Sequence, residues 1–232
     1  MYILCDENCS PVGTCFVVSP KKLVSAYHNI SFTSKYIKNW IILKVLERSN
    51  ESYIFDDHPI NVKVCAHKMG MDWVVFERVD DNNFEANTIV PLHTDASALP
   101  ALKGSKGTAY HCPVVLFHNK ELDILGPLSV DIRVGFFSQH KAIIQVALFA
   151  GSSGGLFALE NGTALGMHLE GINSAKLVAT IVRERAEAIK NGLTFSKDDD
   201  LTIASDLNTA SMGAVSEALV FALNQDLIEA CK

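Results

Sequence analysis

The chain has 232 residues, of which 48% are hydrophobic and 20% charged, so a globular protein with one large domain or two small ones is expected. Its net charge of −6 argues against nucleic acid or an anionic membrane as the main partner. The sequence contains no run of about 18 apolar residues, so no transmembrane helix is expected. The first residues lack the basic and apolar regions of a signal peptide.

Short strands are predicted for the first part of the chain, from Gly13 to about Val90. Segments rich in β-branched and aromatic residues alternate there with turn signals such as Ser19-Pro20. The expected strands are residues 14–19, 23–26, 40–46, 52–55, 61–67 and 73–78. Strands at this regular spacing are typical of a barrel or a sandwich.

A polar segment rich in small residues, 83–106, separates these strands from a second set. A segment of this kind is expected of a crossover between two barrels. Asn161 and Gly162 supply the turn before the last strand of the second set. The strands of that set are residues 107–112, 114–118, 129–137, 141–148, 155–159 and 164–169.

Helices are predicted after Gly171, where the period of the apolar residues changes. Leu177 and Ile181 belong to a series at helical spacing that predicts a helix over residues 174–190. Residues 211–231 are interpreted as a second helix. Its stretch 218–223 is apolar on every side, so this stretch is either deeply buried or partly strand.

The segment Gly151-Ser152-Ser153-Gly154-Gly155 places serines in a glycine-packed turn between two apolar runs. Glycines let the backbone approach a substrate closely and let consecutive N–H groups point at one spot. An oxyanion hole requires that geometry. The two serines of this turn are candidate nucleophiles, and two glycines follow Ser153.

Two residues upstream of the serines, His28 and Asp72, are candidates to activate a serine nucleophile. A serine hydroxyl is weak at neutral pH and requires a base within hydrogen-bond reach, and His28 is the candidate base. Asp72 stands at the mouth of the apolar strand 73–78 and is the candidate that holds the imidazole. Asp56 and Asp57 are rivals for this role, in a turn that suits an exposed bend better.

The order His, Asp, Ser, each beside a suitable strand, resembles the trypsin/chymotrypsin-like serine proteases. The resemblance covers about residues 13–171. It implies an all-β fold, a chymotrypsin-like double six-stranded β-barrel with a C-terminal helical extension. The implied units are an N-terminal barrel over residues 1–96, a C-terminal barrel over 97–172 and a helical extension over 173–232.

The same resemblance implies a serine endopeptidase. Its catalytic residues would be His28, Asp72 and Ser153, and the N–H groups of Gly151 and Ser153 would form the oxyanion hole. Secreted trypsin-like enzymes usually carry Asp where this chain has Ser152, and that Asp pairs with a freshly cleaved N-terminus. No zymogen cleavage of that type is therefore expected.

The segment Gly166-Met167-His168 resembles the picornaviral main proteases and the bacterial glutamyl endopeptidases. In those families this histidine floors the primary specificity pocket and hydrogen-bonds a Gln or Glu side chain, which an imidazole N–H suits. His168 would play that part here, with Leu148 in the pocket wall. Leu169 to Gly171 would offer a strand edge to the substrate backbone. The alternative is that His168 is a hydrogen-bonded core histidine.

The six cysteines are expected to be free thiols. Secreted trypsin-like enzymes characteristically have a cysteine directly after the catalytic histidine, where this chain has Asn29, so an intracellular, cytoplasmic protein is expected. The spacing of Cys5, Cys9 and Cys15 is loose for a zinc site, and neither a metal nor a cofactor is expected.

The expected partner is a protein or peptide substrate, and the C-terminal helices are a surface for a homo-oligomer or another chain. A second hypothesis stays open from another class of function. The chain would then be a catalytically silent protease-fold module that binds peptides or proteins.

Overall fold

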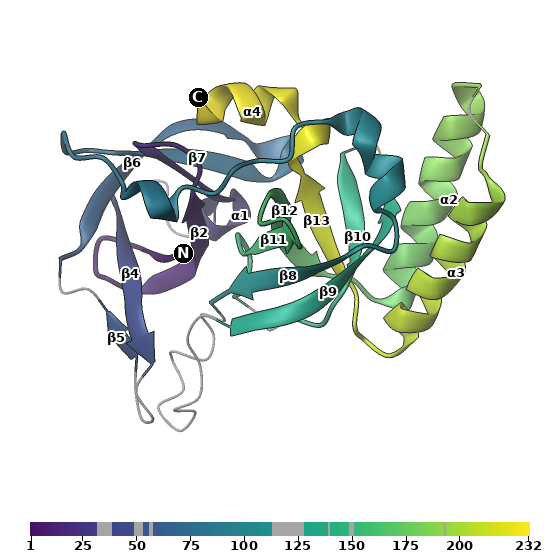
Figure 1. The fold of residues 1–232 in the computed structure, drawn as a ribbon, viewed down its shortest axis with the longest axis horizontal. Helices are drawn as coiled ribbons and strands as arrows, with labels where there is room; N and C mark the ends of the chain where they lie inside the picture. The colour runs from purple at the N-terminus through teal and green to yellow at the C-terminus, as the bar shows by residue number, and fades with distance from the viewer. Residues whose placement is uncertain are drawn as a thin grey trace.

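Two β-barrels lie side by side in the computed structural model, and helices cover the outer side of the second barrel (Figure 1). The structure describes residues 1–31, 39–48, 53–55, 58–112, 128–138, 140–148, 151–192 and 194–232. The predicted strand 114–118 lies outside these residues. In the described part of the chain, no helix is both long enough and apolar enough to cross a membrane.

The first barrel is closed by six antiparallel strands in the order β1-β2-β3-β7-β6-β4, because β1 also pairs with β4. A short strand, β5, extends this sheet from β4. The inward residues, among them Leu23, Val74 and Phe76, are fully buried in one apolar cluster. The strands are β1 Tyr2–Cys5, β2 Pro11–Val17, β3 Lys22–Ala26, β4 Trp40–Arg48, β5 Tyr53–Phe55, β6 Ile60–Lys68 and β7 Trp73–Arg78.

The second barrel is also closed, in the order β10-β13-β12-β11-β8-β9. Its interior holds a second apolar cluster that includes Ala109, Phe157 and Ala218. The strands are β8 Lys106–His111, β9 Leu128–Phe137, β10 Lys141–Gln145, β11 Leu156–Leu159, β12 Ala164–Gly171 and β13 Ser216–Val220. The predicted double six-stranded barrel is confirmed.

The range predicted as a helical extension, residues 173–232, contains a strand as well as helices. β13 lies within this range, pairs with both β10 and β12, and closes the second barrel. All five of its residues, Ser216–Val220, are buried. This strand interrupts the helix predicted over 211–231. The sequence leaves two alternatives for the stretch 218–223, deep burial or partly strand, because an apolar run has the same pattern in a buried strand as in a buried helix, and residues 218–220 are strand.

Two helices, α2 Ser174–Lys190 and α3 Lys197–Ser211, are instead inserted between β12 and β13. The helix predicted over residues 174–190 is confirmed. The Asn173 side chain caps α2, and a capping box of Ser196 and Asp199 begins α3. Both helices pack on the second barrel through an apolar cluster of Phe136, Ile143, Ile172, Leu177, Ile181, Ile203, Ala210 and Val215.

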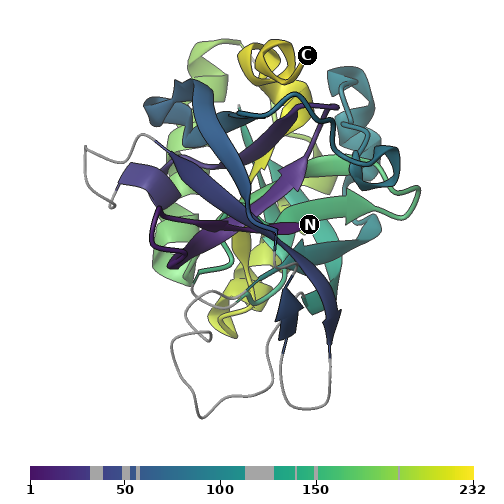
Figure 2. The ribbon, with the colours of Figure 1, turned by 90° about the vertical axis from the view of Figure 1, so that its left-hand side faces the viewer.

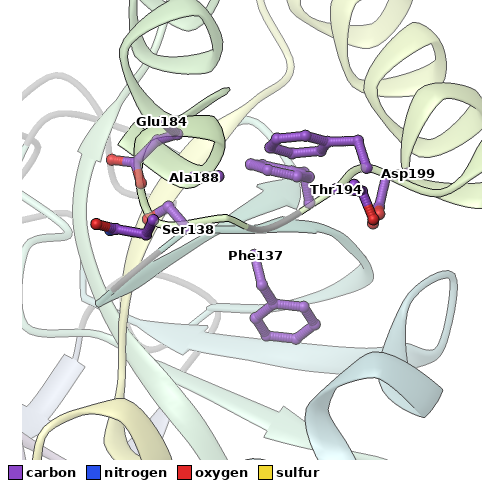
Figure 3. Close-up of a pocket in the computed structure, with 9 residues that line it drawn as sticks. Phe137, Ser138, Glu184, Ala188, Thr194 and Asp199 are labelled. Carbon is purple, nitrogen blue, oxygen red and sulfur yellow. The ribbon is translucent and has the colours of Figure 1, made fainter. Parts of the chain in front are cut away.

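A cavity of about 330 Å³ lies where these helices meet the end of β9. Phe137 and Ser138 line it from the barrel, and Glu184, Ala188 and Thr194 line it from the helical side (Figure 3). None of the candidate site residues lines this cavity.

The last helix, α4 Gln225–Cys231, returns to the first barrel after a 3-10 turn over Phe221–Leu223. It lies across the top of the molecule in both views (Figures 1 and 2). Leu227 and Cys231 are buried in the apolar cluster between the barrels, together with Phe16 and Trp73. The C-terminal segment is therefore part of the interface that holds the two barrels together.

Candidate active site

His28 and Asp72 come from neighbouring strands of the first barrel. The last residue of β3, Ala26, pairs with Trp73, the first residue of β7. The chain that follows β3 therefore lies beside Asp72, which directly precedes β7. Asp72 accepts a hydrogen bond from the His28 backbone N–H at 2.9 Å through Oδ1, and its Oδ2 lies 2.7 Å from His28 Nδ1. The pair is partly exposed, with 31% and 28% of the two side chains accessible.

The backbone of Asp72 supports this pairing. Asp72 has a φ of 59°, in the left-handed region that a short polar residue tolerates better than most. Its carbonyl accepts the N–H of Tyr27 at 3.2 Å. Asp72 therefore accepts hydrogen bonds from the backbone N–H groups of Tyr27 and His28 and from the imidazole of His28. Together these three bonds fix the orientation of the ring. The rivals Asp56 and Asp57 lie outside the described residues.

Ser153 lies in the loop before β11, at the junction of the barrels. Its carbonyl accepts hydrogen bonds from Thr14 N–H at 3.0 Å and from the Asn29 side chain at 2.9 Å. Asn29 follows His28 directly, so this contact places the serine loop beside the histidine. Gly154 has a φ of +86°, and an added Cβ would lie 2.0 Å from the Thr14 carbonyl oxygen. The close approach therefore requires glycine.

The Ser153 hydroxyl donates a hydrogen bond to the carbonyl of Leu169 at 2.9 Å. In the described part of the chain it makes no hydrogen bond to His28. The structure thus brings His28, Asp72 and Ser153 to one place, with the His–Asp bond formed and the Ser–His bond not formed. Catalytic hydrogen bonds often tighten only when substrate binds.

The two proposed oxyanion donors flank Ser152. Gly151 has a φ of +86°, which glycine adopts without strain. Among the residues that the structure describes, neither the N–H of Gly151 nor that of Ser153 has an acceptor. Residues 149 and 150, which precede this turn, lie outside the described residues.

His168 is buried on β12, with 3% of its surface accessible. Its ring packs edge-on against Phe157, with centroids 5.8 Å apart. Burial, with smaller contributions from His111 and His28, lowers the pKa of His168 to about 3. The imidazole is therefore neutral at physiological pH. Its Nδ1 atom is buried and has no hydrogen-bond partner in the described chain.

The other predicted substrate-binding residues are Leu148, Leu169 and Gly171. Leu148 is partly buried against the core of the second barrel, and Leu169 is buried between the barrels. Gly171 pairs with Ser216 of β13 on one side. On the side of β12 that faces β11, the last strand pair is Met167 with Leu156, and the His168 N–H still bonds to the Gly155 carbonyl. Within the described residues, Leu169 to Gly171 have no strand partner on this side.

A buried pair, His111 and Ser152, was not predicted from the sequence. The Ser152 side chain is fully buried, and its Oγ lies 2.7 Å from His111 Nδ1. Burial lowers the pKa of His111 to about 4. Ser152 stands between the two proposed oxyanion donors, so its side chain attaches this loop to the barrel interior.

All six cysteines are free thiols in the structure. Cys9 and Cys65 are exposed, and the other four are buried. Among the described residues, no group of three or more His, Cys, Asp or Glu side chains has an arrangement that could hold a metal ion.

Comparison with known proteins identifies the fold. No protein-family model and no curated protein matches the sequence. A Glu endopeptidase structure matches 100% of this chain and 89% of its own with a TM-score of 0.60 and 13% identity. An inactive mutant form of Rv3671c from M. tuberculosis H37Rv matches 99% of this chain and 85% of its own, with a TM-score of 0.56 and 13% identity. The chain has the chymotrypsin-like protease fold.

A third solved structure supports this assignment. The MamO protease domain from Magnetospirillum magneticum matches 99% of this chain and 94% of its own, with a TM-score of 0.54 and 10% identity. In this chymotrypsin-like fold the described strands form both barrels. His28 pairs with Asp72, and the neighbouring Asn29 side chain is hydrogen-bonded to the Ser153 loop.

Proposed function

We propose that the protein is a serine endopeptidase in which Ser153 is the nucleophile, His28 the general base and Asp72 the residue that orients the base. The observation that carries this proposal is the pair of hydrogen bonds from His28 to Asp72, beside a loop that Asn29 attaches to the same barrel. The substrate is a protein or peptide, as it is for proteases of this fold.

The reaction begins when the Ser153 hydroxyl turns from the Leu169 carbonyl toward His28. Its oxygen attacks the scissile carbonyl carbon and its proton passes to Nε2 of His28, because Asp72 occupies Nδ1. The N–H groups of Gly151 and Ser153 stabilise the oxyanion. The intermediate collapses, the C–N bond breaks, and His28 gives the proton to the leaving amine. Water then cleaves the acyl-enzyme by the same steps.

The proposed specificity is cleavage after Gln or Glu. A neutral imidazole N–H is a suitable donor to an amide oxygen, and the lowered pKa of His168 keeps it neutral. Gln is therefore favoured over an ionised Glu, which a protonated histidine would bind better. Leu148 offers no side-chain donor. The free edge of β12 at Leu169 to Gly171 would pair with the substrate backbone.

A second candidate function is a catalytically silent module that binds peptides. The bond from Ser153 Oγ to the Leu169 carbonyl favours it, because this bond holds the hydroxyl away from the base. Both candidates bind a peptide beside the free edge of β12, and they differ only in whether Ser153 reacts.

A fluorophosphonate probe distinguishes the two functions. The proposal predicts covalent labelling of the wild-type protein, with the adduct mapped to Ser153 by mass spectrometry. Ser153→Ala and His28→Ala should both remain unlabelled, and the second control retains the serine. A folded wild-type protein that takes up no probe would be a silent binding module.

A further inference from the structure

Two buried imidazole nitrogens in the second barrel have no hydrogen-bond partner in the described chain. They are Nε2 of His111 and Nδ1 of His168. The residues are 1% and 3% accessible, so bulk solvent does not supply the partner. A buried polar atom without a partner is costly and rare in native proteins, so each of these nitrogens requires an explanation.

The strand register places the two histidines in one row. β8 pairs antiparallel with β11 so that Tyr110 stands opposite Leu156. His111 follows Tyr110 and Gly155 directly precedes Leu156, so these two residues continue the pairing by one step. On the other side of β11, the His168 N–H donates to the Gly155 carbonyl at 2.7 Å. Opposed residues of neighbouring strands point to the same face of a sheet.

That face is the interior of the second barrel. Ala109 and Phe157 belong to the interior cluster, and His111 and Gly155 lie two residues along the chain from Ala109 and Phe157, respectively. His168 pairs with Ala218, another member of the cluster, and its ring touches Phe157. Both imidazoles therefore point inward on the two sides of Gly155.

Gly155 lies between the two histidines in this row. A Cβ built on this glycine would lie 2.9 Å from the Cβ of His111, closer than real Cβ atoms approach. A side chain here would occupy the space that separates the imidazoles. The second glycine after the nucleophile thus has a packing role of its own.

The hydrogen bond to Ser152 fixes the tautomer of His111. The Ser152 hydroxyl is buried, and His111 Nδ1 is its one partner in the described chain. A buried O–H must donate, so Nδ1 is the acceptor and the proton of the neutral ring is on Nε2. The lowered pKa values of both histidines agree with two neutral rings.

We propose that His111 is a positioning residue for substrate selection: its Nε2–H donates to Nδ1 of His168 through one bridging water. This bond would hold His168 as the Nε2–H tautomer, with a donor directed at the substrate side chain. The hydrogen-bond chain then runs from Ser152, between the oxyanion donors, through His111 to His168. The part that concerns substrate rests on the proposed function.

The tautomers can be measured without any catalysis. In ¹⁵N-labelled Ser153→Ala protein at pH 7, long-range ¹H–¹⁵N spectra should show both His111 and His168 as Nε2–H tautomers. In the His111→Leu variant, His168 should change to a mixture of tautomers. A His168 that carries its proton on Nδ1, or one that His111→Leu leaves unchanged, would overturn the proposal.

Two milder variants keep the test decisive if His111→Leu does not fold. Ser152→Ala removes one hydroxyl and should abolish the Nε2–H preference of His111. His111→Gln keeps an amide donor near the Nε2 position and should preserve the His168 tautomer. The opposite result in either variant would contradict the proposed direction of the hydrogen bonds.

Peptide cleavage supplies the second readout. His111→Leu should reduce the kcat/KM ratio of Gln over Glu substrates by about ten-fold, the effect of one hydrogen bond, and His111→Gln should restore it. An unchanged ratio in an active His111→Leu enzyme would remove His111 from selection. A wild-type protein that cleaves nothing would refute the endopeptidase, while the spectra still decide the tautomers.

Discussion

Asp72 accepts two hydrogen bonds from His28, one from the backbone N–H at 2.9 Å and one at Nδ1 at 2.7 Å. The first bond aligns the short helix α1 His28–Ser31, which begins with the histidine, and the second fixes the orientation of the imidazole ring. A carboxylate that holds both the backbone and the imidazole leaves Nε2 as the nitrogen available to a serine. A substitution at Asp72 therefore tests the proposed triad directly.

Asp72→Asn should reduce kcat by roughly 10⁴-fold, because the amide stabilises the wrong tautomer of His28 and cannot stabilise the imidazolium. KM should change little, since Asp72 lies behind the histidine. Steady-state kinetics on a peptide substrate measures both. Asp56→Asn and Asp57→Asn are the matched controls, and they should keep nearly full activity. An inactive Asp57→Asn beside an active Asp72→Asn would reassign the third residue.

The substrate preference depends on a neutral His168. With its pKa near 3, the imidazole does not titrate between pH 6 and 8. The preference for Gln over Glu should therefore stay constant across that range, and His168→Ala should abolish it. A peptide library digested at both pH values measures the ratio. A preference that moves toward Glu as the pH falls from 8 to 6 would show that His168 takes up a proton in this range.

Acid should destabilise the fold through the two buried histidines. The unfolded chain takes up protons near pH 6.5, whereas His111 and His168 in the folded chain resist protonation until about 4 and about 3. The free energy of unfolding should therefore fall as the pH drops from 6.5 toward 4, by up to about 1.4 kcal/mol per pH unit for each histidine. Burial raises the pKa of Asp206, which acts in the opposite direction above its ordinary value of 3.8.

Urea unfolding between pH 7 and 4.5 measures this slope. His168→Gln and His111→Gln should each make it shallower, because each removes one group that titrates differently in the two states. His140→Gln is the control, since His140 is exposed. A wild-type slope that the two buried variants leave unchanged would show that other groups cause the acid sensitivity.

Local sequence signals predicted those elements whose pattern is distinct. The strand 73–78 and the helix 174–190 have the predicted bounds, because one is a short run bounded by turn residues and the other an amphipathic stripe with a cap. β13 was not distinguishable in the same way. Its side chains are buried on both faces, and a run without period does not separate a strand from a helix.

The sequence likewise predicted only those parts of the candidate site that have a local signal. His28, Asp72 and Ser153 each stand beside a strand end or a glycine turn that marks them in the sequence. The contact of His111 with Ser152 joins residues 41 positions apart. It depends on how β8, β11 and β12 align in a closed barrel, and no local pattern encodes that register.

Thiol reactivity should separate the six cysteines into two classes. Burial raises the pKa of Cys5, Cys112 and Cys231 to about 12 and raises the pKa of Cys15 well above its usual range, so their reactive thiolates are scarce as well as inaccessible. Under native conditions a thiol reagent should modify Cys9 first and Cys65 more slowly. Mass spectrometry of the modified protein counts the sites, and denaturant should expose the other four. A disulfide in freshly purified protein would contradict the prediction of free thiols.

The C-terminal helix should be essential to stability, although it follows the last strand of the barrel. Leu227 is fully buried between the barrels, whereas Leu201 on α3 is 66% exposed. Leu227→Ala should lower the free energy of unfolding by about 2–5 kcal/mol, because it leaves a cavity in that interface. Leu201→Ala should change it by less than about 0.5 kcal/mol. Chemical denaturation of the two variants gives the comparison. Equal stabilities would show that α4 does not hold the two barrels together.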